Sequence, residues 1–409
     1  MNYFSLIVFF LLSSVTYAET CKDLSSAQSI LDCALERDPT VARARGVSEQ
    51  GEALEGVARQ LPNPELNTMA VYGDNFGTRV GNTQVSLTHN FELGGKRAGR
   101  IDKAVADREF AKNEFQKTKE EIFISTAKTL YRIRHLLNEI EIIDEALATF
   151  SKIHKQYRTR PRLNPEQQVT SSIFQLAEGD YRLKKAQIEA ELNDLERHLE
   201  IAVGTPLKIG DKMLPTAKKN WPKVNEDSSE QLSNAADWRM SESFLKSAQA
   251  ELSIAKGNSW PDLKIGPSIQ FETEATNTFQ LYGVSLTMQL PAYHLNSAGR
   301  SYAYQNLAIA EKVFNSKKFE IVRERKALVV RYQKALKSLE EAASNVELDK
   351  KHKNIESLFH RGIVASALVI EAHRQLIDFT RSKNDQELDA LEAYWKINAF
   401  DGKLLETKL

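Results

Sequence analysis

The sequence VSLTHNFELGGKRAGR at residues 85–100 returns, with one extra residue, as VSLTMQLPAYHLNSAGR at 284–300. In both copies a proline, Pro62 or Pro261, lies 23 residues before the first valine. A repeat of about 200 residues is too long for a solenoid unit, so it indicates duplication of a whole structural half. Each half is predicted to contain a helix that leads into the proline, two strands and then a long helix.

The composition of the chain limits the classes of partner. The 409 residues carry 55 basic and 55 acidic side chains, and this balance gives no bulk attraction to nucleic acid. Residues 1–18 have the apolar core and the small terminal residues of a secretory signal peptide. No later segment approaches the roughly 18 consecutive apolar residues of a membrane-spanning helix. The mature chain is therefore expected to be exported and hydrophilic.

Both cysteines, Cys21 and Cys33, follow the expected cleavage site. The residues before Cys21 do not resemble a lipoprotein signal, so a non-acylated N-terminus is expected. In an oxidising compartment the two cysteines can form a disulfide that fastens the N-terminal segment to the first helix, worth about 3 kcal/mol. The alternative is a pair of free thiols.

Alternation of apolar and polar residues predicts four strands, at about 65–72, 83–91, 262–272 and 279–290. Turn-rich segments at 73–82 and 273–278 are expected to connect them. One apolar and one polar face is typical of a membrane β-barrel with a wet lumen. Four strands cannot close a barrel, and open edges are not tolerated in lipid, so three chains are expected to share a twelve-stranded barrel. The alternative is a soluble four-stranded sheet covered by helices.

Heptad-like spacing of apolar residues predicts a helix of about 60 residues, or about 90 Å, after each strand pair. Breaks at 160–165 and 361–366 precede return helices of about 35 residues, so each half is expected to form a long helical hairpin. The fold class is thus mainly α with a membrane β part. The expected organisation is a signal peptide at 1–18, a first repeat at 19–204, a linker at 205–233 and a second repeat at 234–409.

In this order of elements the mature chain resembles the TolC family of outer-membrane efflux proteins. The motifs LPNPEL at 61–66 and FELGGKR at 91–97 look most like its CzcC-like branch, which serves resistance-nodulation-division pumps for heavy-metal cations. The resemblance implies a homotrimer in the lipid of the cell outer membrane, with a helical tunnel through the periplasm. It also implies a periplasmic adaptor protein that links the trimer to the inner-membrane pump. The chain itself would be a passive conduit for heavy-metal cations.

Two kinds of site follow from this resemblance and from the repeat. Gly94 and Gly95 lie where a strand must turn into a helix, and Pro291 lies at the equivalent elbow of the second half. The basic residues that follow the elbows would either contact lipid phosphates or form a solvated helix start. The segments expected to dock the adaptor are the two helical tips, with residues Arg160, Leu163, Arg361, Gly362, Ile363 and Val364.

The family's two gating aspartates would fall at positions 368 and 371, where this chain has Leu368 and Glu371. Three copies of Glu371 would form one acidic ring that selects cations. The alternative is an exposed glutamate on a helix. The missing first carboxylate argues against a double ring.

No phosphate loop, nucleophile elbow or metal-ligand cluster is recognisable, so neither an enzyme nor a cofactor or metal site is expected. The eight histidines are scattered, and surface or packing roles are expected for them. A duct for heavy metals is the favoured function. The alternatives are the same duct in drug efflux or type I protein secretion, and a soluble periplasmic coiled-coil scaffold.

Overall fold

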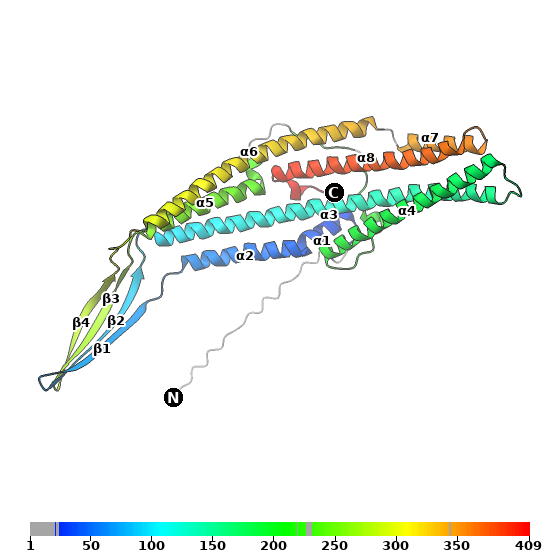
Figure 1. Cartoon of the computed structure of the whole chain (residues 1–409). Coiled ribbons are helices and arrows are strands. Elements are labelled where there is room, and N and C mark those ends of the chain that lie inside the picture. Colours follow the sequence, from blue (N-terminus) through cyan, green and yellow to red (C-terminus); the bar gives the residue numbers. More distant parts are fainter. Residues whose placement is uncertain (1–20, 22–23, 219, 226–230, 343–344) are drawn as a thin grey trace.

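The computed structural model describes residues 21, 24–218, 220–225, 231–342 and 345–409. The expected signal peptide at 1–18 lies outside these residues. Four strands project from one end of a long helical body. At the other end lie the two loops that each connect a pair of antiparallel helices (Figure 1). Within the described residues, no helix is both long and apolar enough to span a membrane.

The helix, strand pair and long helix occur twice. The first half contains α1 (Ala27–Arg37), α2 (Pro39–Arg59), β1 (Glu65–Asn75), β2 (Thr78–Phe91), α3 (Lys96–Arg158) and α4 (Pro165–Val203). The second half contains α5 (Ala236–Gly257), β3 (Leu263–Glu274), β4 (Asn277–Met288), α6 (Ser297–Glu341), α7 (Asn345–His360) and α8 (Ser366–Phe400). The predicted fold class, mainly helical with four antiparallel strands, is confirmed.

The strands form one antiparallel sheet in the order β1-β2-β3-β4. Its register pairs Leu66 with Leu87, Val85 with Ile269 and Ile269 with Tyr282, so apolar side chains from all four strands share one face. The other face carries mainly polar residues and glycine. No described helix covers the sheet (Figure 1). The alternative of a soluble sheet covered by helices is therefore wrong.

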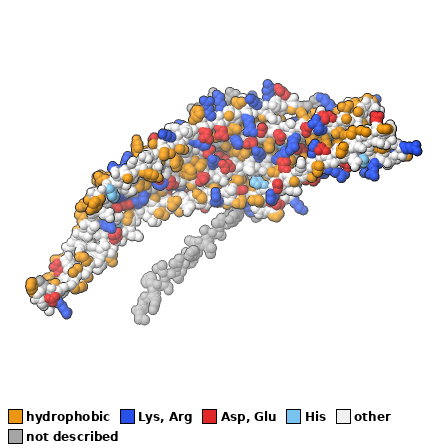
Figure 2. Space-filling view, in the orientation of Figure 1, with side chains coloured by type: hydrophobic (Ala, Val, Ile, Leu, Met, Phe, Trp, Pro, Cys, Tyr) orange, Lys and Arg blue, Asp and Glu red, His pale blue; other side chains and the backbone are white. Residues whose placement is uncertain are grey.

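The apolar face of the sheet is exposed in the single chain. Leu66 of β1 is 69% exposed and Val284 of β4 is 71% exposed. Charged side chains are spread over the helical body, whereas the strands carry few of them away from the hairpin ends (Figure 2). A surface of this kind requires a covering environment, which the part of the chain that the structure describes does not supply.

The first hairpin is longer than expected, because most of the predicted loop at 73–82 is strand. β1 and β2 pair as far as Asn75 opposite Thr78, and the chain reverses at Phe76 and Gly77. Both turn residues have positive φ, 52° and 84°, as a type I′ hairpin turn requires. The glycine and asparagine residues that suggested a loop are held in the ladder by their cross-strand partners.

The long helix of the second half is interrupted, contrary to the prediction of one helix of about 60 residues. α6 ends at Glu341, and Ala342 has an extended conformation with φ −72° and ψ 137°. The break was not predicted because the heptad-like spacing of apolar residues continues through Leu339 and Ala342. A Ser344-x-x-Glu347 pattern, typical of a helix start, is its signal in the sequence. By contrast, α3 continues for 63 residues without interruption.

A belt at mid-length holds the helices together. Ile30 and Cys33 of α1 pack against Leu130 and Ile133 of α3. On another side of α3, Trp395 of α8 lies with its ring centroid 5.8 Å from that of Tyr131. The disulfide between Cys21 and Cys33 is formed, so this alternative of the two that the sequence left open is confirmed. It links the N-terminal segment to α1 beside this packed region.

The two elbows use different residues for the same backbone conformation. Gly94 and Gly95 have φ of 72° and 76°, and Gly95 is the N-cap of α3. A Cβ on Gly94 would lie 2.8 Å from the carbonyl oxygen of Gly257, so only glycine fits. In the second elbow the residue with positive φ is Asn296, at 50°, and Pro291 lies five residues before it.

The basic residues of the first elbow have partners within the chain. Lys96 Nζ donates to Asp262 Oδ1 at 2.6 Å, and Arg97 donates to the backbone carbonyl of the last residue of α2 at 2.7 Å. Arg100 pairs with the carboxylate of Glu92. These side chains therefore fasten the elbow to neighbouring elements, and neither lipid contact nor a solvated helix start is needed to account for them.

Candidate functional site

The two helical tips meet at the end of the molecule farthest from the strands (Figure 1). A cavity of about 330 Å³ lies between them, lined among others by Tyr157, Arg160, Phe359, Gly362 and Val364. The structure thus brings the two predicted tips, which are about 200 residues apart in the sequence, onto one surface.

Each tip is closed by a different helix-capping arrangement. At the α7–α8 tip, Gly362 has φ 72°, and its N–H donates to the carbonyl of Phe359 at 2.8 Å. At the α3–α4 tip, which lacks glycine, Asn164 caps α4 by accepting from the backbone N–H of Gln167 at 2.8 Å. The guanidinium of Arg160 lies 5.3 Å from the ring centre of Tyr157. Both tips are thus shaped by their own residues.

The tips differ in what they expose. Ile363 is 58% exposed. Arg160 and Arg361 are also exposed, whereas Leu163 and Val364 are half-buried. Among the six predicted docking residues, the large exposed side chains are therefore those of Arg160, Arg361 and Ile363.

Glu371 of α8 is ion-paired within its own helix. Arg374 donates to both of its carboxylate oxygens, at 2.6 and 2.8 Å, and Gln375 donates at 2.8 Å. These hydrogen bonds lower the pKa of Glu371 to about 2. Arg374 also donates to Asp378 at 2.9 Å. Two carboxylates therefore share one guanidinium, and the cluster keeps a net negative charge.

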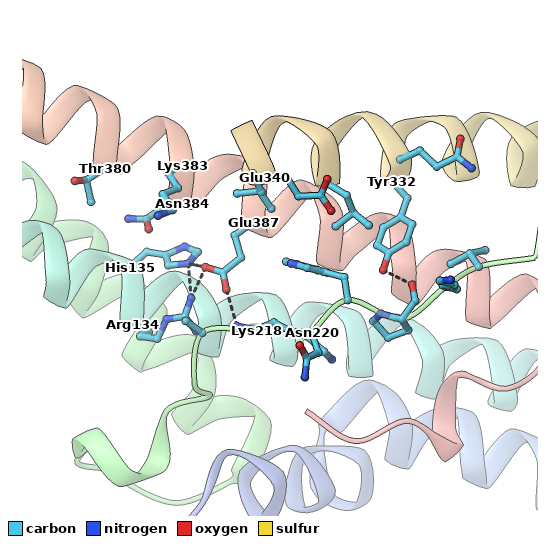
Figure 3. Close-up of a pocket in the computed structure, with 18 of the residues that line it drawn as sticks. Arg134, His135, Lys218, Asn220, Tyr332, Glu340, Thr380, Lys383, Asn384 and Glu387 are labelled. Atoms are coloured by element: carbon cyan, nitrogen blue, oxygen red, sulfur yellow. Dashed lines mark hydrogen bonds and ion pairs between the residues drawn. The ribbon is translucent and has the colours of Figure 1, made fainter. Parts of the chain in front are cut away.

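A cavity of about 1040 Å³ lies near mid-length, between the linker and helices α3, α6 and α8 (Figure 3). At its wall, Glu387 of α8 accepts from Arg134 Nη2 at 2.5 Å and lies 3.0 Å from His135 Nε2. The backbone N–H of Lys218 donates to the same carboxylate at 3.3 Å. One glutamate thus joins two helices and the linker.

The charges of this clamp are set by burial and by the partners. Burial raises the pKa of Glu387, but the hydrogen bond from His135 and the charge of Arg134 outweigh it, so the net shift is downward. Burial lowers the pKa of Lys218. Arg134 Nη1 also donates to the carbonyl of Pro215, at 3.0 Å.

These contacts give the clamp a structural role. On the α6 side of the cavity, Tyr332 donates to the carbonyl of Pro222 at 2.7 Å (Figure 3). Among the side chains that line this cavity, none combines a nucleophile with a positioned base, so the arrangement fastens the linker and performs no recognisable chemistry. Sequence reasoning missed it because Arg134 and Glu387 are 253 residues apart.

One further group was not expected. His352 and Glu356 of α7 and His373 of α8 lie together, with possible ligand atoms within 4.8 Å of one another. The prediction that the histidines are scattered is therefore wrong for this pair. The i, i+4 spacing of His352 and Glu356 was the available signal, and the fold supplied the third residue.

The fold matches solved outer-membrane channels over almost the whole chain. CusC aligns with a TM-score of 0.73 at 13% identity, covering 92% of each chain. MtrE of Neisseria gonorrhoeae, in its open state, aligns with 0.73 at 15% identity, covering 93% of this chain and 90% of that one. The chain has the TolC-like fold of outer-membrane channels. The resemblance to this family that the sequence showed is confirmed at the level of fold.

OprN, another outer-membrane channel, aligns with this TolC-like chain with a TM-score of 0.74 at 15% identity, covering 94% of this chain and 92% of that one. The cobalt-zinc-cadmium resistance protein CzcC of Cupriavidus metallidurans is 21% identical over 270 residues. That alignment spans 65% of this chain and 63% of the length of CzcC. No protein-family profile matches the chain.

We predict that Glu387→Gln loosens the linker. Removing the carboxylate leaves Arg134 and the buried His135 without their anionic partner, which costs about 3 kcal/mol. The expected result is a lower free energy of unfolding at pH 7 and faster proteolysis within 205–233. The control is Asp389→Asn, because Asp389 pairs with Arg331 at the surface, where such a pair is worth less than about 1 kcal/mol.

The pH dependence gives a second readout of this variant. The pKa of Glu387 is lowered on folding, so its stabilisation is present above the unfolded value of about 4.3 and is lost as pH falls through the folded value. The difference in stability between wild type and Glu387→Gln should therefore narrow below about pH 4. If the difference in free energy of unfolding between the two proteins is the same below about pH 4 as at pH 7, the role of Glu387 in the clamp is contradicted.

Proposed function

We propose that this protein is the outer-membrane channel of a tripartite efflux system, acting as a homotrimer and a passive conduit for heavy-metal cations. The observation that carries the proposal is the four-stranded sheet. Among the described residues it is open at both edges, apolar on one face and not covered by any other element. The TolC-like fold supports the same function.

The edges of the sheet support a closed ring of chains, and the resemblance to the TolC family sets the number at three. β1 and β4 each have one side without a partner strand among the described residues, and exposed backbone groups cannot remain unpaired in lipid. Pairing β4 of one protomer with β1 of the next removes all edges once three chains have joined, and it yields twelve strands. The apolar face then contacts lipid, and the polar face lines the lumen.

The opposite end is proposed to dock a periplasmic adaptor protein. The tips expose Arg160, Arg361 and Ile363 on the surface around the cavity between them. The adaptor would link the channel to an inner-membrane resistance-nodulation-division pump, which supplies the energy. The cavity that the two tips share makes them one docking unit, so a change in one tip alters the surface of the other.

Heavy-metal cargo is supported by the similarity to CzcC and by the motifs at 61–66 and 91–97. The same duct in drug efflux or type I protein secretion is the competing function, since a passive conduit need not carry the specificity of its pump. The soluble scaffold is disfavoured by the exposed apolar face of the sheet.

The membrane assignment predicts opposite effects for neighbouring residues of β4. Val284 belongs to the apolar face, and Ser285 belongs to the polar face. Val284→Arg places a charge in lipid, at a cost of about 2–4 kcal/mol near the midplane, and should reduce recovery of the trimer in the outer-membrane fraction. Ser285→Arg places the same side chain in the lumen and should leave recovery unchanged.

Membrane fractionation and a gel with and without heating measure this outcome, because folded barrel trimers should migrate differently after heating. Equal recovery of the two variants, or recovery of the wild-type protein as a soluble monomer, would refute the membrane assignment.

We predict that Glu371→Gln lowers cation selectivity, if three copies of the residue face the axis as a ring. The expected result is a shift of the reversal potential in planar bilayers toward weaker cation preference. The pKa of Glu371 is about 2, so wild-type selectivity from this group should not change between about pH 7 and pH 4. The control is Asp389→Asn, an exposed ion-paired carboxylate elsewhere on α8. An unchanged reversal potential removes the ring from the proposal.

The cargo is tested in a deletion strain. Loss of a heavy-metal duct should increase sensitivity to zinc, cobalt and cadmium and leave sensitivity to detergents and dyes unchanged. Restoration by the wild-type gene on a plasmid is the control. Sensitivity to detergents alone would assign the channel to drug efflux.

A further inference from the structure

Two histidines and a glutamate converge between α7 and α8. His352 is 4% exposed and His373 is fully buried. Their Nε2 atoms are 3.3 Å apart, and Glu356 Oε1 lies 3.2 Å from His373 Nε2 and 3.9 Å from His352 Nε2. Three atoms that commonly bind metals therefore form a small triangle inside the helical body.

The local sequence explains this convergence. His352 and Glu356 are four residues apart on α7 and therefore project from the same face. The chain then reverses at Gly362, which lies 10 residues after His352 and 11 residues before His373. Because α7 and α8 run antiparallel from this turn, residues at equal distances from it lie opposite one another.

The distances fit a single metal ion. Zinc binds histidine nitrogen and carboxylate oxygen at about 2.0–2.2 Å, so neighbouring ligands of a tetrahedral ion are about 3.4 Å apart. The three separations in the structure, 3.2, 3.3 and 3.9 Å, lie around this value. Two imidazoles and one carboxylate suit zinc-type divalent transition metals, whereas magnesium and calcium prefer oxygen ligands alone.

The surroundings hold the three groups in place. Thr149 of α3 donates its hydroxyl to Glu356 Oε1 at 3.1 Å, an outer contact of the kind that orients metal-binding carboxylates. The ring of Phe150 meets the ring of His373 edge-on, with centroids 5.1 Å apart.

The same groups can also bond directly to one another. His352 Nε2 lies 3.0 Å from His373 Nδ1, so His352 can donate to His373 and His373 can donate to Glu356. This chain leaves His352 Nδ1 without a partner among the described residues. It also leaves two buried imidazoles to bond to one another beside a half-buried carboxylate, which is a costly use of buried polar groups.

We propose that His352, Glu356 and His373 form a site for one zinc-type divalent cation, which fastens α7 to α8 within each protomer. A three-residue set leaves the fourth position of tetrahedral zinc to a water or a hydroxyl group. The site lies inside the helical body of a single chain, so it is separate from any cargo in the lumen. It is independent of what the channel exports.

The first experiment uses the full-length protein purified in detergent and treated with a chelator. Titration with zinc against a chromophoric competitor should show one site per chain, and cobalt(II) should show the visible absorption of a tetrahedral complex. Magnesium and calcium should not compete. Zinc should also raise the melting temperature and slow hydrogen exchange in 345–373.

Variants locate the bound metal. His352→Gln and Glu356→Gln each remove one ligand and should weaken zinc binding by roughly 100-fold or more, and they should abolish the shift in melting temperature. Thr149→Val should weaken zinc binding by about 10-fold. The matched control is His154→Gln, because His154 of α3 contacts Ser171 across the α3–α4 hairpin and belongs to no such group. It should bind zinc like the wild type.

Wild-type protein that binds zinc no more tightly than His352→Gln, or whose cobalt complex is not tetrahedral, overturns the site in favour of the hydrogen-bonded chain. The cobalt spectrum of the wild type decides this even if His352→Gln does not fold. Glu356→Gln gives a further test, since glutamine can still accept from Thr149. Failure of the site leaves the channel proposal intact, because that proposal rests on the sheet.

Discussion

The registration of the four strands is the constraint on which the rest of this molecule depends. Side chains alternate between the two faces of a strand, so a shift of one residue in any pair would mix apolar and polar positions. The observed register keeps Leu87, Ile269 and Val284 on one face. A sheet that is apolar on one side and, within the described residues, open at both edges is incomplete alone, and the proposed trimer would complete it.

The helical body solves a different problem, which is to hold long helices in register over their whole length. Apolar packing alone is compatible with sliding by one turn. Buried polar contacts at mid-length oppose this, because each pairs particular residues of different elements. Glu387 joins α8 to α3 and the linker, and Arg325 of α6 pairs with Asp401 at the end of α8 at 2.8 and 3.0 Å. These contacts at mid-length therefore fix how far each helix is shifted along its neighbours, both toward the strands and toward the tips.

The end with the helical tips is less uniform than the body, and the interruption between α6 and α7 is the main reason. α3 is one uninterrupted helix from the elbow to the tip, whereas α7 is a separate helix of 16 residues. A separate helix needs its own attachment to α8. Phe359 provides a further attachment, to α4, by packing against Phe174 with ring centroids 5.9 Å apart. His352 and Glu356 lie on this short helix and contact His373 of α8, where an additional link has the largest effect.

The sequence by itself determined the duplication, the order of elements, the two tips and the alternation of the strands, because these are properties of neighbouring residues. The sequence also predicted the position of the glycine elbow, because two consecutive glycines indicate a backbone with positive φ. The limits of the first hairpin and the break after Glu341 were missed, because pairing partners and capping override the propensities of single residues there.

Only the tertiary structure decided which distant residues meet. The ion pair of Glu371 and Arg374 lies within one helix, whereas the glutamate clamp joins residues more than 250 positions apart. The histidine pair was invisible for the same reason, since its members lie on different helices. The pattern of neighbouring residues determines secondary structure. Contacts between helices form only when the hairpins fold back, so the sites that these contacts create cannot be predicted from the local pattern.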